Sequence, residues 1–244
     1  MKRWWLIAVY LLALLVMLPA KIIYWLPIPA QVSISQVSGS LWQGRIGSLQ
    51  AQGVTLNDVQ WDWQLLQLFT GEVAVDVRVP PQNNPLAVNG RISAGLTELA
   101  ATDLRASGDL ATLLQLANTR LPLKTQGNWN LSIDTFVVSD PSPAKWCNQL
   151  TGSANGRNIQ VLVNGAWQSL GDFPVALGCT ESGAVTLTMN GENSLALAMQ
   201  GDINSQDINI SGTVRPNPRT PEGLAQMFQY LGQPDSQGRY RFSL

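Results

Sequence analysis

Apolar and polar residues alternate one by one along most of the chain, which is the pattern of β-strands with one buried and one solvated face. At 185–189, for example, Val185, Leu187 and Met189 share one face. The same alternation predicts strands over residues 31–37, 73–79, 86–92, 125–133, 159–163, 195–199 and 208–214. Because short connections separate these segments, the pattern indicates antiparallel hairpins and meanders.

Glycine recurs inside these predicted strands, as at Gly44, Gly90 and Gly212. Glycine in a strand interior marks a bulge or a bend, so we expect a curved or rolled antiparallel sheet. The proline-rich stretch 80–85 is a candidate boundary between two layers of that sheet. No long flexible linker interrupts the pattern, and the sequence therefore predicts one mainly β domain over residues 27–244.

Two segments have helical rather than alternating patterns. Residues 109–117 place apolar side chains at helical spacing behind Asp109, a favourable N-cap. At 220–232, Thr220 is a candidate cap, Pro221 takes the first helical position and Gly232 ends the helix. The apolar stripe of this second helix consists of Leu224, Met227, Phe228 and Leu231. Such a stripe usually covers one end of a sheet, and docking of a partner protein is the alternative.

The first 26 residues differ from the rest of the chain. An uncharged apolar run follows Lys2 and Arg3, and counted on to Leu26 it has about 23 residues, or ~35 Å as a helix. That length spans ~30 Å of hydrocarbon. Lys21 interrupts the run, but a lysine near a helix end can extend its ammonium to the lipid headgroups.

These features predict a signal-anchor transmembrane helix over residues 1–26, with its N-terminus in the cytoplasm because positive charge precedes it. Residues 27–244 would then lie in the periplasm of a Gram-negative cell, and the protein would be a single-pass inner-membrane protein. We expect four aromatic residues at the membrane interfaces, namely Trp4, Trp5, Tyr24 and Trp25. A cleaved signal peptide is the alternative, although residues 18–20 supply only one of the two small residues that cleavage prefers.

Composition narrows the classes of function. The 244 residues include no histidine, which removes Ser-His-Asp and Cys-His catalysis and imidazole zinc sites. A net charge of −1 argues against nucleic-acid binding, which needs a basic face. No phosphate loop, nucleophile elbow or carboxylate dyad is recognisable. We therefore expect neither an enzyme nor a cofactor or metal site; an enzyme that uses Asp or Glu alone is the alternative.

Cys147 and Cys179 are the only cysteines of the chain. An even count in an oxidising compartment predicts a disulfide. Closing a loop of that size would constrain the unfolded chain by roughly 3–4 kcal/mol. A reactive thiol pair is the alternative, but the two residues lack CxxC spacing and have only Lys145 nearby to lower a thiol pKa.

Two stretches are more specific than the general alternation. The first, 37–63, indicates strand, glycine turn, strand, turn and strand, and we interpret its Trp42, Trp61 and Trp63 as structural cross-strand anchors. The second, 212–240, contains the C-terminal helix and a Pro-Asp turn before a short last strand. Four arginines make this second stretch locally basic: Arg215, Arg219, Arg239 and Arg241. We expect them to form a solvated face, with an acidic partner or lipid headgroups as the alternative.

These two stretches, in this order behind an apolar N-terminus, resemble the type II secretion system protein N family. The likeness covers nearly the whole chain and rests on Gly39-Ser40-Leu41-Trp42-Gln43-Gly44, the later Trp61-Asp62-Trp63, and the ending from Val214-Arg215-Pro216 to Gly238-Arg239-Tyr240. It implies an accessory inner-membrane component of the machine that exports folded periplasmic proteins across the outer membrane. The partners it implies are other subunits of that machine, in the inner-membrane platform or the secretin. It implies no catalytic residues.

A looser resemblance leads to a second hypothesis. The glycine-apolar alternation followed by a tryptophan-rich turn is similar to AsmA-like proteins, whose sheets form open grooves and which are linked to phospholipid transport. This likeness implies a lipid-handling module in which a curved sheet shelters acyl chains. The alternation is equally compatible with a closed hydrophobic core, and a shared fold does not determine a function.

Overall fold

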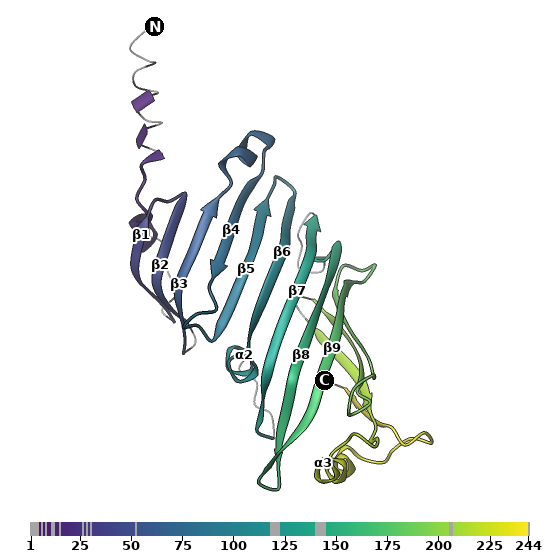
Figure 1. Ribbon diagram of the computed structural model, residues 1–244. Helices are drawn as coiled ribbons and strands as arrows, with labels where there is room; N and C mark the ends of the chain where they lie inside the picture. Colours follow the sequence, from purple (N-terminus) through teal and green to yellow (C-terminus); the bar gives the residue numbers. More distant parts are fainter. Residues whose placement is uncertain are drawn as a thin grey trace.

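The computed structural model describes residues 16–25, 31–51, 53–117, 123–139, 145–204 and 207–243, together with Trp5, Ile7, Val9, Tyr10, Ala13, Leu14, Pro27 and Pro29. Within these residues, thirteen strands form one open antiparallel sheet in which the spatial order equals the chain order (Figure 1). Each strand therefore pairs only with its neighbours in the chain. The mainly β fold class predicted from the alternation is confirmed.

The strands are β1 (Val32–Gly39), β2 (Gln43–Ala51), β3 (Val54–Trp63), β4 (Val73–Val79), β5 (Leu86–Ala94), β6 (Glu98–Asp109), β7 (Thr125–Ser139), β8 (Gln149–Val163), β9 (Ala166–Cys179), β10 (Val185–Asn190), β11 (Ala198–Ile203), β12 (Ile208–Val214) and β13 (Tyr240–Ser243). The 3-10 helices among the described residues are η1 (Ala20–Trp25), η2 (Leu65–Thr70) and η3 (Phe228–Leu231). The α-helices are α2 (Leu110–Leu116) and α3 (Glu222–Met227).

Alternation gives the sheet one apolar and one polar face, because successive side chains of a strand point to opposite sides. In β4, Asp76 and Arg78 alternate with valines and point away from them. The strand registers align the apolar positions of neighbouring strands into rows. One such row crosses β4 to β8 and consists of Val79, Val88, Ala106, Leu131 and Ala154. We call the two sides of the sheet the apolar face and the polar face.

The first three strands share an aligned irregularity. One residue of each strand has no partner in the cross-strand pairing, and these residues are Gln36 of β1, Gly47 of β2 and Asp58 of β3. Gln36 and Asp58 both have φ of 59°, in the left-handed region. Gly47 has no room for a side chain, because a Cβ there would lie 2.7 Å from the Cβ atom of Gln36. Such extra residues bend strands while keeping the apolar positions on one face, so β1 to β3 bend together.

The C-terminal strands pack back onto the sheet. Val214 of β12 and Leu224 of α3 join a buried cluster with Val161 of β8 and Leu170 of β9. In Figure 1, the strands after β9 accordingly pass behind β8 and β9. Among the described residues, the predicted rolling of the sheet is therefore found at this end. Three residues of the predicted C-terminal stripe, Leu224, Met227 and Phe228, pack on the end of the sheet, and the side chain of the fourth, Leu231, lies outside the described set.

The predicted disulfide is present and joins Cys147 to Cys179, with a Cα–Cα distance of 5.6 Å. Cys147 lies in the connection between β7 and β8, and Cys179 is the last residue of β9. The bond therefore holds the start of the β8–β9 hairpin to its end. Cys147 is 1% exposed and Cys179 is half-buried.

The N-terminal segment reaches the sheet earlier than predicted. Pro19 forms an isolated bridge with Ser40, and Ala20 is 1% exposed in a cluster with Val37 and Ile46. The sequence predicted one continuous helix to Leu26, whereas residues 20–25 form the separate 3-10 helix η1 on β1 and β2. The physical reason is Pro19, which has no N–H to donate and whose ring obstructs the preceding helical turn.

The membrane anchor itself stays a prediction. The predicted helix over residues 1–26 falls partly on residues outside the described set, Trp4 among them. Among the residues that are described, no helix is long and apolar enough to cross a bilayer. Trp5 and Trp25 are exposed, whereas the hydroxyl of Tyr24 accepts a hydrogen bond from the backbone N–H of Val37 at 3.3 Å. Tyr24 therefore caps the edge strand β1.

The predicted strand over 195–199 is wrong in its position. The side chain of Asn193 accepts hydrogen bonds from the backbone of Leu195 and Leu197, at 3.1 and 2.9 Å. These bonds hold residues 193–197 in a loop, and β11 begins only at Ala198. Both leucines pack against the C-terminal cluster, which explains the apolar pattern that suggested a strand.

Two further expectations about turns and caps need correction. The stretch 80–85 connects β4 and β5 within one sheet and is no boundary, because the Asn84 amide binds the backbone of Asn57 and of Pro80. The Thr220 hydroxyl does not cap α3: it donates to the Ser194 carbonyl at 2.7 Å. The prediction for the other helix is confirmed, since Asp109 caps α2 by accepting from the Thr112 N–H at 2.7 Å.

Gly44→Ala tests the packing of the N-terminal hairpins. The Trp61 ring lies directly over Gly44, and its Nε1 donates to the Leu41 carbonyl at 2.9 Å. A Cβ at Gly44 would overlap the ring, so we expect the free energy of unfolding to fall by about 1–3 kcal/mol. Urea unfolding followed by tryptophan fluorescence measures the change. Gly95→Ala is the control, because its Cβ would lie 3.7 Å from the nearest atom; equal losses in both variants would refute the packing argument.

Candidate functional site

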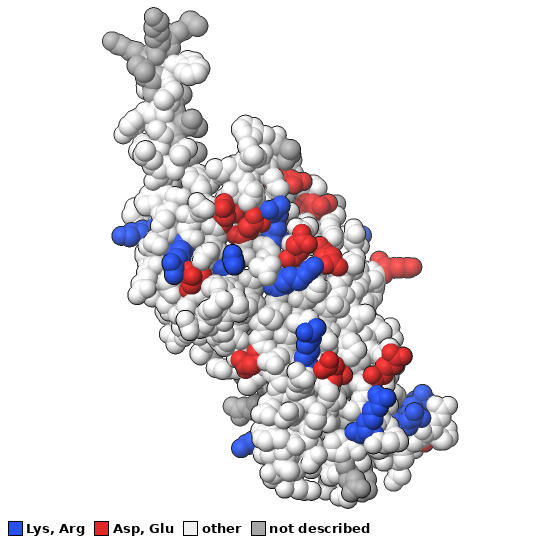
Figure 2. Space-filling model, viewed as in Figure 1, with Lys and Arg blue, Asp and Glu red and all other residues white. Residues whose placement is uncertain are grey.

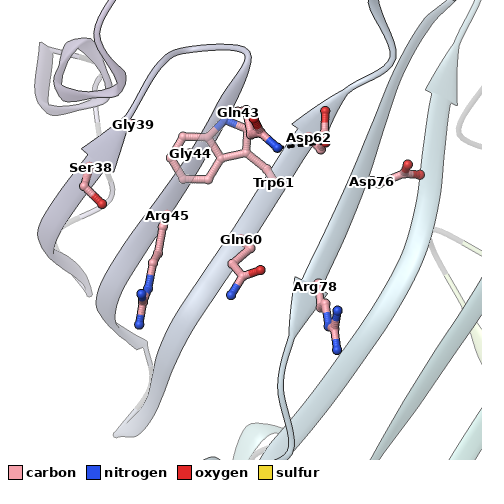
Figure 3. A pocket seen from close by; sticks show the side chains of 10 residues that line it. All are labelled: Ser38, Gly39, Gln43, Gly44, Arg45, Gln60, Trp61, Asp62, Asp76 and Arg78. Atoms are coloured by element: carbon pink, nitrogen blue, oxygen red, sulfur yellow. Dashed lines mark hydrogen bonds between the residues drawn. The ribbon is translucent and has the colours of Figure 1, made fainter.

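Three shallow hollows adjoin one another on the polar face of β1 to β6. The first has a volume of about 430 Å³ and is shown in Figure 3. The second, of about 680 Å³, shares Asp76 and Arg78 with the first, and the third, also about 680 Å³, shares Arg45. We call the combined surface the polar groove. Its central residues are Arg45, Gln60, Asp62, Asp76 and Arg78.

The strand registers place these side chains in two parallel rows. Arg45, Gln60 and Arg78 are direct cross-strand neighbours on β2, β3 and β4. The next row consists of Gln43, Asp62, Asp76 and Arg91, on β2 to β5. In Figure 3, the long side chains of the first row, Arg45, Gln60 and Arg78, extend from adjacent strands on the same side of the sheet. Side-chain parity and register together therefore create the groove.

Asp76 is the most strongly bound carboxylate of the groove. Arg91 donates to it from Nε at 2.7 Å and from Nη2 at 3.0 Å, and Gln64 donates from Nε2 at 2.7 Å. The hydrogen bond from Arg91 is the main cause that lowers the pKa of Asp76 below its ordinary value. The same contact raises the pKa of Arg91. Asp76 is therefore an anion at neutral pH and is a poor proton donor.

Two further carboxylates of the groove, Asp58 and Asp62, also accept hydrogen bonds. Asp58, held at the bulge of β3, forms an ion pair with Arg45 and accepts from Gln60 Nε2 at 3.0 Å. Asp62 accepts from Gln43 Nε2 at 3.2 Å. The exposed guanidinium of Arg78, by contrast, has no hydrogen bond or ion pair with the residues that the structure describes.

This arrangement favours binding over catalysis. On the face seen in Figure 2, basic and acidic side chains interleave over the N-terminal half of the sheet. The groove is wide and open, Asp58 and Asp76 are paired with arginines, and Arg78 remains available to an external anion. No group of three or more His, Cys, Asp or Glu side chains in the described part of the chain could hold a metal ion. A protein surface that presents a carboxylate fits these features.

The residues singled out in the sequence lie at or beyond the margin of the groove. Trp61 borders it, but its ring packs with the cluster around Ile46 on the other face. Trp42 and Trp63 contact each other edge to face, with ring centroids 6.3 Å apart. All three tryptophans are half-buried. They support the hairpins on which the groove is built.

The four C-terminal arginines lie near the other end of the sheet. Arg239 and Arg241 approach the carboxylate of Asp235, at 2.9 and 3.8 Å, while Arg215 and Arg219 are exposed. The backbone N–H of Arg239 is the main cause that lowers the pKa of Asp235 to about 2. The predicted turn before the last strand is therefore held by one carboxylate.

Sequence reasoning missed the residues of the polar groove. Their signal is visible in hindsight, because Gln60 and Asp62, like Asp76 and Arg78, stand two residues apart and thus on one face of a strand. Parity within one strand is readable from the sequence. The register that brings the strands together, and the bulge at Asp58, are not.

Comparison with known proteins identifies relatives along the whole sheet. Residues 30–243 match the family Type II secretion system (T2SS), protein N. A type II secretion system protein N of Vibrio cholerae is 28% identical over 240 residues, covering 96% of this chain and 93% of its own. The protein of that name from Aeromonas hydrophila is 29% identical over 240 residues, covering 95% and 91%. That from Klebsiella pneumoniae is 25% identical over 236 residues, covering 95% and 89%. No solved structure matches the chain.

Asp76→Asn tests the electrostatics of the groove. At pH 7 we expect the free energy of unfolding to fall by about 0.5–1 kcal/mol, because the ion pair with Arg91 is partly exposed and screened by solvent. The folded-state pKa of Asp76 lies below its unfolded value of 3.8, so its contribution is present above that value and is lost as pH falls through the folded pKa.

The difference in the free energy of unfolding between wild type and Asp76→Asn should therefore shrink as the pH is lowered from neutral to below the pKa of the folded carboxyl. Urea unfolding at a series of pH values measures it. Asp207→Asn is the matched control, since Asp207 is exposed and its carboxylate has no ion pair within the described residues. A difference for Asp76→Asn that stays constant with pH would contradict the assignment.

Proposed function

The chain belongs to the type II secretion system protein N family, and from this premise we propose that it is an accessory component of the type II secretion system. In this proposal its apolar N-terminal segment anchors it in the inner membrane, and the sheet lies in the periplasm. There it takes part in the export of folded proteins across the outer membrane. The disulfide between Cys147 and Cys179 suits that oxidising compartment.

The polar groove is the observation that carries a role in protein–protein contact. It offers Arg78 as a free cation beside a row of amides and paired charges, which is the chemistry of a hydrated interface with another protein. The partner we propose is a platform or secretin subunit that presents a carboxylate to Arg78. Charge complementarity of this kind sets the orientation and the rate of docking more than the affinity.

The sheet edges offer a second route to the same partners. β1 and β13 are the end strands of the open sheet, and an edge strand can accept an added strand from another chain. β1 is partly protected, because Tyr24 occupies the N–H of Val37 and the bulge at Gln36 interrupts the strand. We therefore propose the polar groove, in preference to the β1 edge, as the docking site. We assign no enzymatic activity, since Asp58, Asp62 and Asp76 all hold neighbouring donors.

Photocrosslinking in cells tests this role. Probes replace Gln43 in the groove and Gln226 on α3, and mass spectrometry identifies the adducts; both positions are exposed. We expect Gln43 probes to give adducts with platform or secretin subunits. Adding Arg78→Glu should reduce these adducts about fivefold, as expected for losing about 1 kcal/mol of contact free energy.

A probe at Asn209, an exposed residue of β12, controls for random encounters. The assembly role would be abandoned if the Gln43 and Gln226 probes captured no secretion subunit above the yield of the Asn209 probe. Adducts that persist unchanged in Arg78→Glu would keep the partner but remove the groove as its docking site. Urea unfolding confirms that Arg78→Glu remains folded.

A lipid-handling groove is a second candidate function, and one observation favours it. The two clusters of buried apolar side chains found in the described residues lie at the two ends of the sheet. Between them, Val77, Leu104 and Leu131 of the apolar face are half-buried, whereas Val79 is 5% exposed and α2 packs on β6 and β7. Apolar surface that is only partly covered could shelter an acyl chain.

Lipid analysis of the purified protein tests this second function. After extraction in a mild detergent, phospholipid should copurify, and Ala106→Phe should reduce the bound amount about twofold or more by filling the apolar row. Ser107→Phe is the matched control, because the adjacent side chain points to the polar face. Absence of phospholipid from the wild-type protein, or equal loss in both variants, would exclude the lipid groove.

A further inference from the structure

One rim of the sheet carries large apolar side chains that extend into solvent. Helix η2, between β3 and β4, contributes four of them, and the turn between β5 and β6 contributes the fifth. We call this set the apolar rim: Leu65, Leu66, Leu68, Phe69 and Leu96. Three of its members, Leu66, Phe69 and Leu96, are 82%, 89% and 99% exposed. Exposure this complete on neighbouring leucine and phenylalanine side chains marks an interaction surface.

In η2 the apolar side chains face solvent and the polar ones face the protein, which is the reverse of an ordinary solvent-exposed turn. Gln64, which precedes η2, is half-buried and donates to Asp76, and Gln67 is likewise half-buried. The leucines and the phenylalanine point outward instead. The helix carries no acidic residue in its first turn and no basic residue in its last, and Gly71 ends it at φ 84°. The polar side chains therefore face the protein while the apolar ones face outward.

The apolar rim lies on the side of the sheet formed by the turns after β1, β3 and β5, where the N-terminal segment also leaves the sheet. The turn between β1 and β2 is bonded to the N-terminal segment on one side and to the end of β3 on the other. The Leu41 N–H donates to the Leu18 carbonyl at 2.8 Å, and the Trp63 N–H donates to the Trp42 carbonyl at 2.8 Å. Val73 pairs with Ala94, which brings the turn at Leu96 beside η2. Figure 1 shows the N-terminal segment and the connection between β3 and β4 extending to the same side of the molecule.

The N-terminal segment is itself apolar and exposed at that edge. Among its described residues, Trp5, Ile7, Val9 and Val16 are about half-exposed or more. Whatever apolar phase receives this segment therefore lies next to the apolar rim. The five side chains of the rim are leucines and a phenylalanine, which offer no hydrogen-bonding group, whereas a protein interface combines an apolar centre with a surrounding ring of hydrogen bonds. A lipid surface needs only apolar contact.

We propose that the apolar rim is a second membrane-contact site, which inserts into the interfacial layer of the bilayer that holds the N-terminal segment. The inference rests on the proposed membrane attachment of that segment. Glu72 and Glu98, both exposed, stand at the base of the rim and limit the depth of insertion to the headgroup boundary. Two contact points fix the orientation of the sheet, with its strands directed away from the membrane.

Depth-dependent fluorescence quenching tests the proposal on the full chain. Single cysteines are introduced as Leu66→Cys, Phe69→Cys and Leu96→Cys and labelled with bimane, since the two native cysteines are joined in a disulfide. The protein is reconstituted into vesicles of phosphatidylethanolamine and phosphatidylglycerol that contain nitroxide lipids. Gln82→Cys is the aqueous control, because it lies in the turn between β4 and β5, at the other end of the strands. Ala13→Cys reports on the N-terminal segment.

We expect nitroxides near the headgroups to quench the three rim labels about twofold more than the Gln82→Cys label, because interfacial side chains insert ~5–10 Å. Rim labels that are quenched no more than Gln82→Cys, with Ala13→Cys quenched, overturn the rim site while the anchor stands. Because Ala13 would lie near the bilayer centre of an anchor over residues 1–26, its label is read with nitroxides on the lower acyl chains. Quenched rim labels with an Ala13→Cys label that these deep nitroxides do not quench support the rim and reject the anchor. If neither is quenched, both fail. If the rim labels remain accessible to iodide in vesicles and photoprobes at Leu66 capture a protein in cells, the partner of the rim is a protein and the lipid proposal is rejected.

Discussion

The structure depends on a backbone hydrogen-bond ladder in which every strand pairs only with its neighbours in the chain. Because spatial order equals chain order from β1 to β13, no long crossover is needed, and each pairing can form from a local hairpin. The ladder does not close, so the sheet keeps two edges and two faces. Every later feature, including the polar groove, follows from how side chains are sorted between these two faces.

Buried apolar clusters cover the two ends of the sheet, and between them α2 packs on β6 and β7. At the N-terminal end, Ala20 and Ile23 of η1 cover Val37 and Ile46, and at the C-terminal end the later strands and α3 cover β8 and β9. Much of the middle of the apolar face is half-buried, although Val79 and Val138 are each 5% exposed, and the polar face is open to solvent. Such a sheet has much surface for its length, which suits a component that works by contact.

The contacts of the two faces differ in kind. On the polar face, carboxylates find donors on adjacent strands, and Arg78 remains for an external anion. On the apolar rim, Leu66 and Phe69 face outward while the neighbouring glutamines face the protein. Protein contact through the groove and lipid contact through the rim would hold the sheet between a membrane and the rest of a secretion machine.

From the sequence alone, parity predicted most of the strands but not β6 or β9, helical spacing predicted α2 behind its Asp109 cap, and the cysteine count predicted the disulfide. These are local or compositional signals. The family was indicated by the resemblance of two motif-bearing stretches, 37–63 and 212–240. The sequence misplaced β11, since the loop at Leu195 has apolar residues for tertiary packing rather than for a strand. It also extended the N-terminal helix past Pro19, where packing of Ala20 begins. The tertiary structure decided the register that joins Asp76 to Arg91, the outward direction of Leu66 and Phe69, and which faces stay uncovered. Those properties depend on contacts between segments distant in the chain, and no local pattern carries them.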